Sequence, residues 1–298
     1  MNRVFLGTLR VVLVLGAALA GPLPIMHPAS GQSPLPEPAA KFDAAHRVEF
    51  PSLLSPASDR SAQPAQLHGY LFKPEGAGPF PAVVMGHGCS GLSNPPGRAR
   101  WIDRVVSWGH VALLVDSFTP RGAKTCNDGK ADDLLRAADA YGALKFLGRQ
   151  SFVDARRIAA MSWGEGGSAV FLALESGPNN PQTPNIALAK PEVFAGLRFR
   201  GAVAVYPESC FSYDNFYAPV LWLYGEKTGS RAMAACARET KKLTAAGVRI
   251  SVQVYPNATF GFDQEYEGSS PAGDPIRYDP AATADAVERV KQFLAANL

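Results

Sequence analysis

The sequence predicts an α/β domain in which a mostly parallel sheet of eight strands is covered by helices on both faces. From about residue 46 onwards, short runs rich in β-branched residues alternate with longer stretches of helical periodicity. Two of the short runs, Ala82–Met85 and Val111–Val115, are apolar at every position, which is typical of parallel strands buried on both faces. The 298 residues are 47% hydrophobic and 18% charged, which supplies enough apolar material for one sizeable core.

The elements can be assigned in chain order from these patterns. The first two strands have no helix between them and are predicted to form an antiparallel edge. The last helix has Asp279 at its N-cap and Pro280 in its first turn. Residues 176–191, rich in Pro and Asn, are predicted to form a surface loop. The predicted strands are His46–Phe50, Gln66–Lys73, Ala82–Gly86, Val111–Asp116, Arg157–Met161, Gly201–Tyr206, Val220–Tyr224 and Ile250–Tyr255, and two further helices are predicted over Arg98–Trp108 and Lys130–Leu147.

The N-terminal end has the pattern of a secretory signal peptide. Arg3 and Arg10 precede the apolar run Val11–Gly21, which is too short to span a bilayer as a helix. Ala18-Leu19-Ala20 then matches the small-residue pattern of a signal-peptidase site. The proline-broken segment that follows argues against an uncleaved membrane anchor.

The chain is therefore divided into a signal peptide over residues 1–20, a Pro-rich tether over residues 21–45 and a single domain over residues 46–298. The protein is expected to be exported, either periplasmic or secreted, with no membrane span after signal cleavage. Its net charge of +3 is small, and two of the positive residues lie in the signal segment, so no nucleic-acid partner is expected.

A strand, a sharp turn of small residues and a helix are predicted around Met161–Gly167. This arrangement is the nucleophile elbow, in which the residues two positions before and after the nucleophile must be small. Ser162 and Gly166 satisfy that requirement. The nucleophile position itself is Gly164, which has no side chain to attack with.

Several sequence blocks together resemble the dienelactone hydrolase family of α/β-hydrolases, specifically its exported branch. The resemblance extends from about residue 66 to the C-terminus and implies an α/β-hydrolase fold. Besides the elbow, it rests on residues 86–91 (GHGCSG), 116–122 (DSFTPRG), 206–210 (YPESC), 225–228 (GEKT) and 255–263 (YPNATFGFD).

The family's catalytic residues do not carry over to this chain. By the resemblance, its Cys or Ser nucleophile would stand at Gly164, its acid at Thr228 and its histidine base at Phe260. In this fold the histidine follows the last strand, but the histidines here are His27, His46, His68, His87 and His110, all in the first 110 residues. No catalytic residue is therefore expected at the three triad positions.

Seven residues are candidates for lining a ligand pocket, each with a structural alternative. His87 could act as a base towards Ser90 or Ser162, or hold its loop through hydrogen bonds. The N–H of Glu165 and one from Cys89 or Ser90 could remain as an oxyanion hole. The candidates are His87, Cys89, Ser90, Arg121, Trp163, Glu165 and Phe260.

Among these candidates, Arg121 could anchor a substrate carboxylate or pair with Asp116 to hold its loop, the latter being favoured. Trp163 and Phe260 could line a pocket or belong to the core. No cofactor is expected. No metal is expected either, because the acidic residues at strand ends, Glu208, Glu226 and Asp263, lack the spacing of a metal set with histidine.

Export implies an oxidising setting, so the four cysteines are predicted to form two disulfides. Four cysteines allow three pairings. Strand neighbours in the implied fold favour Cys89–Cys126 and Cys210–Cys236, because a disulfide requires nearby Cα atoms.

Three functions remain open from the sequence. The first is a dienelactone hydrolase-like pseudoenzyme that has lost triad-based ester or lactone hydrolysis and binds a small ligand with a carbonyl or carboxylate group. The second is an active carboxylic ester or lactone hydrolase with a non-standard set, such as His87 with Ser90 or Ser162. The third is an exported interaction or scaffold protein without a ligand. Substitution of all three triad residues favours the first.

Overall fold

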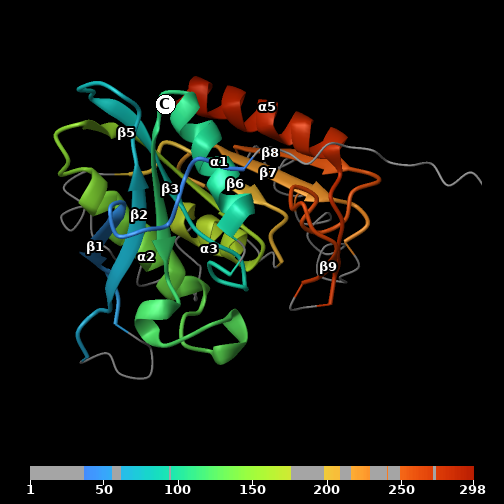
Figure 1. The fold of residues 1–298 in the computed structure, drawn as a ribbon, viewed down its shortest axis with the longest axis horizontal. Coiled ribbons are helices and arrows are strands. Elements are labelled where there is room, and N and C mark those ends of the chain that lie inside the picture. The colour runs from blue at the N-terminus through green and yellow to red at the C-terminus, as the bar shows by residue number, and fades with distance from the viewer. Residues whose placement is uncertain are drawn as a thin grey trace, which may run out of the picture. The chain divides into compact units, whose positions relative to one another are not determined.

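The eight predicted strands form one sheet in the order β1-β2-β4-β3-β5-β6-β7-β8 (Figure 1). The computed structural model describes residues 37–55, 62–93, 95–175, 198–208, 216–228, 240, 249–270 and 273–298. The strands are β1 (Arg47–Pro51), β2 (Gln66–Phe72), β3 (Phe80–Met85), β4 (Val111–Asp116), β5 (Val153–Trp163), β6 (Ala202–Val205), β7 (Val220–Gly225) and β8 (Ile250–Tyr255).

Strand directions agree with the predicted α/β architecture. β1 pairs antiparallel with β2, and β2 pairs antiparallel with β4, so the first two strands form the predicted antiparallel edge. All other pairs in the sheet are parallel. β5 begins at Val153 and not at the predicted Arg157. The polar residues Asp154–Arg157 near its start hide the apolar pattern from which a strand is predicted. β6 is shorter than predicted, ending at Val205.

Helices cover both faces of the sheet. The helices are α1 (Pro95–Ser107), α2 (Asp133–Leu147), α3 (Glu165–Leu174) and α5 (Pro280–Asn297), with short 3₁₀ turns η1 (Thr119–Arg121) and η2 (Cys126–Asp128) and a small hairpin of β9 (Gly268–Ser269) and β10 (Pro275–Ile276). Asp279 caps α5 as predicted, since its carboxylate accepts from the N–H of Ala282. None of the helices in these described ranges is long and apolar enough to cross a membrane.

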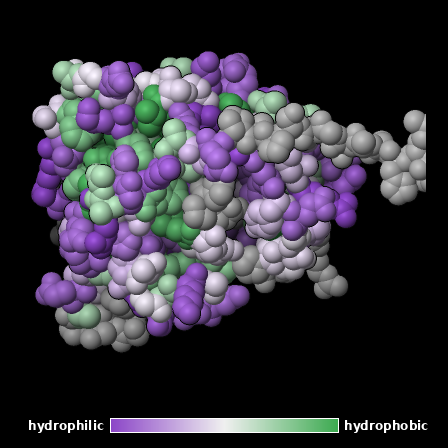
Figure 2. Space-filling view, viewed as in Figure 1, coloured by the Kyte–Doolittle hydropathy of each residue, from purple (hydrophilic) through white to green (hydrophobic). Residues whose placement is uncertain are grey.

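Two apolar clusters on opposite faces of the sheet form the core. Because side chains alternate along a strand, Val84 packs towards α2 and α3, whereas Val83 packs towards α1 and α5. On the second face, Ile102 of α1 and Val290 of α5 are fully buried. Figure 2 shows that the face in view is mainly polar at its periphery, with apolar side chains gathered towards the middle of its left half. This three-layer arrangement explains why the central strands are apolar at every position.

The segment just before β1 packs on the domain. The N–H groups of Ala39 and Ala40 donate to the carboxylate of Asp103 on α1, at 2.8 and 2.9 Å. The ring of Phe42 lies 5.1 Å from that of Tyr70. Contacts with the domain therefore begin inside the predicted tether, ahead of residue 46, because Phe42 adds an aromatic ring to the apolar surface of β2. The predicted signal peptide and the predicted loop over residues 176–191 lie outside the described residues.

The sheet order determines where a site can form. β3, β5 and β6 lie side by side in parallel at the centre of the sheet, so the segments that follow them meet at one edge. Open parallel sheets bind ligands outside these carboxyl ends. Residues 87–93, Gly164 and 206–208 are the segments that follow β3, β5 and β6.

Candidate functional site

The predicted elbow joins β5 to α3 at Gly164. This glycine has φ 55° and ψ −135°, a conformation that strains any residue with a Cβ. Gly166 is also required, because a Cβ there would collide with the carbonyl oxygen of His87. The backbone of a nucleophile elbow is thus present, while the residue at its tip carries no side chain.

A cavity of about 380 Å³ opens beside this elbow at the carboxyl ends of the strands. Of the seven predicted pocket residues, Cys89, Ser90, Trp163 and Phe260 line it, whereas His87, Arg121 and Glu165 do not. Gly164 lies in the wall. The cavity is also lined by residues that were not predicted to do so, among them Arg98, Tyr206, Glu208, Gln264 and Tyr266.

Gly164 and Phe260 face each other across the cavity wall. A Cβ placed on Gly164 would lie 3.2 Å from Cζ of Phe260, so the ring occupies the space next to the missing side chain. Phe260 also packs on Tyr206, with ring centroids 4.7 Å apart. Thr228 is buried outside the cavity, where its hydroxyl donates to the carbonyl of Gly225 and closes the turn after β7. None of these three side chains is placed to attack a carbonyl or to move a proton.

His87 is a buried residue that holds two loops together. Its Nε2 accepts the N–H of Ser117 at 3.1 Å, and its Nδ1 donates to the carbonyl of Gly88 at 2.8 Å. Burial, followed by the positive charge of Arg136, lowers the pKa of His87 to about 3. Both ring nitrogens are therefore hydrogen-bonded to the backbone. His87 thus holds its loop, as the structural alternative to a role as a base states. The hydroxyl of Ser162 has no hydrogen-bond partner among the residues described.

This buried imidazole predicts a specific loss of stability in acid. The unfolded imidazole takes up a proton near pH 6.5 and the folded one only near 3, so unfolding binds a proton between these values. The free energy of unfolding should therefore fall as pH falls through that window, by up to about 1.4 kcal/mol per pH unit. Urea unfolding of wild type and His87→Gln at several pH values measures this slope. Equal slopes for wild type and variant, with the surface variant His46→Gln as reference, would refute the assignment.

Arg121 forms a buried ion pair behind the loop that follows β4. Its guanidinium donates two hydrogen bonds to Asp139 of α2, both 2.8 Å long, and a third to the carbonyl of Ser117. The prediction that Arg121 pairs with Asp116 was wrong. The carboxylate of Asp116 accepts from the N–H groups of Phe118 and Thr119 instead. Asp116 is nearer in sequence, but it is used by the turn, so Arg121 pairs with the adjacent helix.

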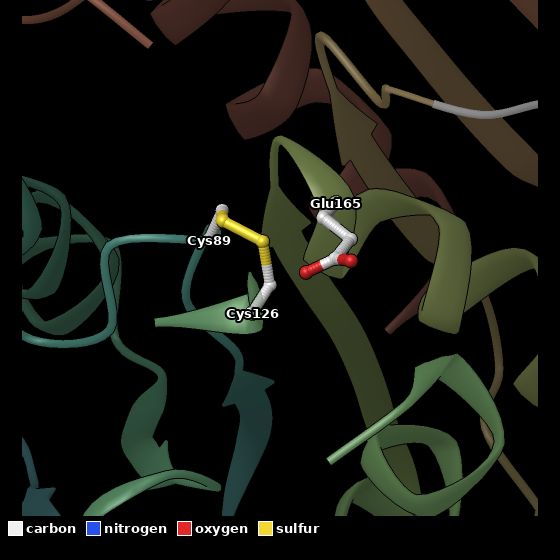
Figure 3. A group of neighbouring side chains, drawn as sticks. All are labelled: Cys89, Cys126 and Glu165. Atoms are coloured by element: carbon white, nitrogen blue, oxygen red, sulfur yellow. A yellow bond between two sulfur atoms is a disulfide. The ribbon is translucent and has the colours of Figure 1, made fainter. Parts of the chain in front are cut away.

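The predicted disulfide between Cys89 and Cys126 is present, with Cα atoms 4.7 Å apart, and its Cys89 lines the cavity (Figure 3). Glu165 points towards this disulfide, and its carboxylate binds Arg136 at 2.9 Å. The two sulfurs and a carboxylate oxygen of Glu165 lie within 4.8 Å of one another, but sulfurs joined in a disulfide are not thiolate ligands for a metal. Cys210 and Cys236 lie outside the described residues.

Arg98, at the start of α1, brings a positive charge to the cavity. Its side chain is 7% exposed and its guanidinium lies 4.1 Å from the centre of the Trp163 ring. Nη1 of Arg98 has no hydrogen-bond partner within the described part of the chain. A buried guanidinium nitrogen without an acceptor is suited to a ligand that brings one.

The cavity floor is held by the buried carboxylate of Asp263. It accepts from Nε1 of Trp101 at 2.7 Å, from Nε1 of Trp163 at 3.1 Å and from the hydroxyl of Tyr206 at 2.6 Å. These donors come from α1, the end of β5 and the end of β6. One carboxylate thus ties two lining residues, Trp163 and Tyr206, to each other and to α1.

Glu208 places a second carboxyl group in the cavity wall. Its Oε1 is buried without a hydrogen-bond partner among the described residues, and it would lie 3.3 Å from a Cβ on Gly164. Burial, followed by the negative charge of Glu165, raises the pKa of Glu208 to about 7. The group can therefore bind or release a proton near neutral pH.

Sequence reasoning missed the two ionisable groups of the cavity for different reasons. Glu208 is considered from the sequence only as a possible metal ligand, and is rejected as one, although it directly follows the Tyr-Pro pair after β6. Arg98 was treated only as the start of a helix. A search for charged residues within two positions of strand ends and helix starts around the elbow would have found both.

Comparisons with known proteins agree with the fold and the family resemblance. A family model described as the dienelactone hydrolase family matches residues 185–298. No curated protein sequence matches the chain.

Among solved structures, a protein assigned as a dienelactone hydrolase from Klebsiella pneumoniae is 20% identical, with a TM-score of 0.56 over 84% of this chain and 98% of that one. Esterase 2 of Thermogutta terrifontis, phosphoramylated by tabun, is 14% identical, with a TM-score of 0.59 over 86% of this chain and 97% of the esterase. At these identities the structures establish the fold alone.

Proposed function

We propose that this chain, which has the α/β-hydrolase fold and matches the dienelactone hydrolase family over residues 185–298, has lost triad-based ester and lactone hydrolysis and binds a small carboxylate- or carbonyl-bearing ligand in its strand-end cavity. The observation that carries the proposal is an open cavity of about 380 Å³ beside a glycine elbow, with an unpartnered guanidinium nitrogen in its wall. The signal-peptide pattern places this activity, by the same proposal, in the periplasm or outside the cell.

The loss of covalent catalysis is supported by the three triad positions. Gly164 offers no nucleophile, Phe260 fills the space beside it with a ring that cannot accept a proton, and Thr228 lies outside the cavity. The alternative base, His87, uses both ring nitrogens on backbone groups and does not line the cavity. A hydroxyl without a base is a poor nucleophile at neutral pH, so Ser90 and Ser162 do not replace the triad.

Ligand binding is supported by what the cavity retains. Cys89 lines the cavity, and its N–H donates to no other described backbone group, so it remains as a donor. Nη1 of Arg98 supplies a charged donor for a carboxylate. The rings of Trp163 and Phe260 provide an apolar wall for the rest of a small molecule.

The proposal is tested by calorimetric titration with a panel of small carboxylic acids and lactones. At least one acid is expected to bind, and Arg98→Met should weaken its binding by about 10- to 100-fold, because a hydrogen bond to a charged group is lost. Arg156→Met, which removes an exposed arginine from β5, is the matched control and should leave the affinity unchanged. If no member of the panel binds, or if Arg98→Met binds as tightly as wild type, the proposal fails and an interaction role becomes the better explanation.

A further inference from the structure

Glu208 stands where a water molecule could replace the missing nucleophile. Its Oε1 would lie 3.3 Å from a Cβ on Gly164, so the carboxyl group stands beside the position that a nucleophile's side chain would take. Oε1 has no partner among the described residues, and both residues line the cavity. The other two atoms nearest to that Cβ position are Cζ of Phe260, 3.2 Å away, and Cα of Gly88, 3.6 Å away.

We propose that Glu208 is a general base that activates this water, so that the cavity hydrolyses small lactones or esters directly, without a covalent acyl-enzyme. The proposal goes beyond ligand binding and gives the site a one-step chemistry in place of the two-step route that needs a nucleophile and a histidine. It assigns Glu208 as a catalytic residue, because its carboxylate contacts the attacking water.

The chemistry balances within this set of groups. The water oxygen attacks the carbonyl carbon while the Glu208 carboxylate takes one water proton, and the carbonyl π electrons move to oxygen. The donor proposed for that oxyanion is the N–H of Cys89, which lines the cavity and donates to no other described backbone group. The oxyanion then re-forms the carbonyl, the bond to the leaving alkoxide breaks, and the alkoxide takes the proton back from Glu208. The products are a carboxylic acid and an alcohol, joined in one molecule when the substrate is a lactone.

The surroundings of Glu208 suit a base rather than a permanent anion. Three carboxylates act on it, those of Glu165 on α3, Asp133 on α2 and Asp274 before β10, against one cation, Arg136 of α2. Together with burial, this excess of negative charge raises the pKa of Glu208 to about 7, which matches a base that must both accept and return a proton near neutral pH.

The experiment uses dihydrocoumarin, a small lactone whose ring opening releases a phenol that can be followed by absorbance. Wild-type protein is expected to hydrolyse it above the buffer rate, with kcat rising through about pH 7 and then levelling off, as Glu208 loses its proton. Glu208→Gln should lower kcat by about 10²- to 10⁴-fold with little change in KM. Glu226→Gln, at an exposed carboxylate after β7, is the matched control and should keep the wild-type rate.

Two further measurements separate this mechanism from its rivals. Mass spectrometry of the protein during turnover should show no acyl adduct, and an adduct on Ser90 or Ser162 would overturn the proposal. The melting temperature of Glu208→Gln at pH 8 should not fall below that of wild type, since the variant removes a buried charge. Equal rates for Glu208→Gln and wild type, or no wild-type hydrolysis, would also overturn it. In the latter case, acid binding that depends on Arg98 would leave the proposed ligand-binding function standing.

Discussion

Replacing Asp263 by alanine is expected to lower the free energy of unfolding by roughly 3–4 kcal/mol, because it orphans three buried donors at once. The indole N–H groups of Trp101 and Trp163 and the hydroxyl of Tyr206 all donate to this carboxylate and are nearly inaccessible to water. An unsatisfied buried donor costs about 1–3 kcal/mol, and the three losses are not fully additive. Urea unfolding at neutral pH measures the change.

Asp285→Ala provides the reference for that measurement. Asp285 also accepts from a tyrosine, Tyr255, at 2.9 Å, and binds Arg289, but its side chain is 43% exposed. Water can replace its contacts, so the expected loss is below about 1 kcal/mol. Asp263→Asn should fall between the two, since one acceptor oxygen remains. A loss below 1 kcal/mol for Asp263→Ala would show that the three donors find other partners, and that the cavity floor does not depend on this carboxylate.

The second large effect concerns restoration of the covalent route. Gly164→Ser alone is expected to remain unlabelled by a fluorophosphonate, because the triad's histidine, which would activate the new hydroxyl, is missing. Gly164→Ser combined with Thr228→Asp and Phe260→His should gain labelling, and should hydrolyse p-nitrophenyl acetate with a burst and at least about 100-fold faster than the single variant. Triad residues act as a unit worth about 10⁶ in rate when complete, so a partial recovery of this size is modest.

Geometry favours the triple variant over the single one. A Cβ at residue 164 lies 3.2 Å from Cζ of Phe260, and the smaller imidazole relieves that contact while supplying the base. The positive φ of residue 164 remains, so serine there should cost about 1–3 kcal/mol of stability in both variants. The double variant Gly164→Ser, Phe260→His is the control for the acid. A folded triple variant that resists labelling would show that the backbone around residue 228 no longer serves a triad.

More of the fold than of the site could be predicted from the sequence, and the reason is physical. The strands Val111–Asp116 and Ile250–Tyr255 are bounded correctly by the sequence pattern, the first because burial on both faces demands apolar residues along it, the second because apolar and polar residues alternate in it. The Cys89–Cys126 pairing also followed, since strand order brings the two loops together. The pattern of apolar residues along a strand does not predict the direction of the side chains in the loops that follow it.

The site shows where that limit lies. Arg121 was expected to pair with the nearby Asp116, but the short turn after β4 had already engaged that carboxylate with two N–H groups. The direction of Glu208 towards Gly164 depends on the path of the chain after β6, and the burial of Arg98 depends on the ring of Trp163. The last two of these contacts join residues far apart in the sequence, so no local pattern predicts them.

The covalent bond between Cys89 and Cys126 has a consequence for how molecules reach the cavity. It joins the loop after β3 to the η2 turn, and the N–H of Cys126 also donates to the carbonyl of Cys89. The loop after β3 is therefore held in place at the cavity once the disulfide has formed. Tyr266, Ser270 and Ile276, in or next to the β9–β10 hairpin, also line the cavity, and the strands of this hairpin pair over only two residues each. We therefore expect any movement that admits a ligand to involve this hairpin more than the disulfide-linked loop.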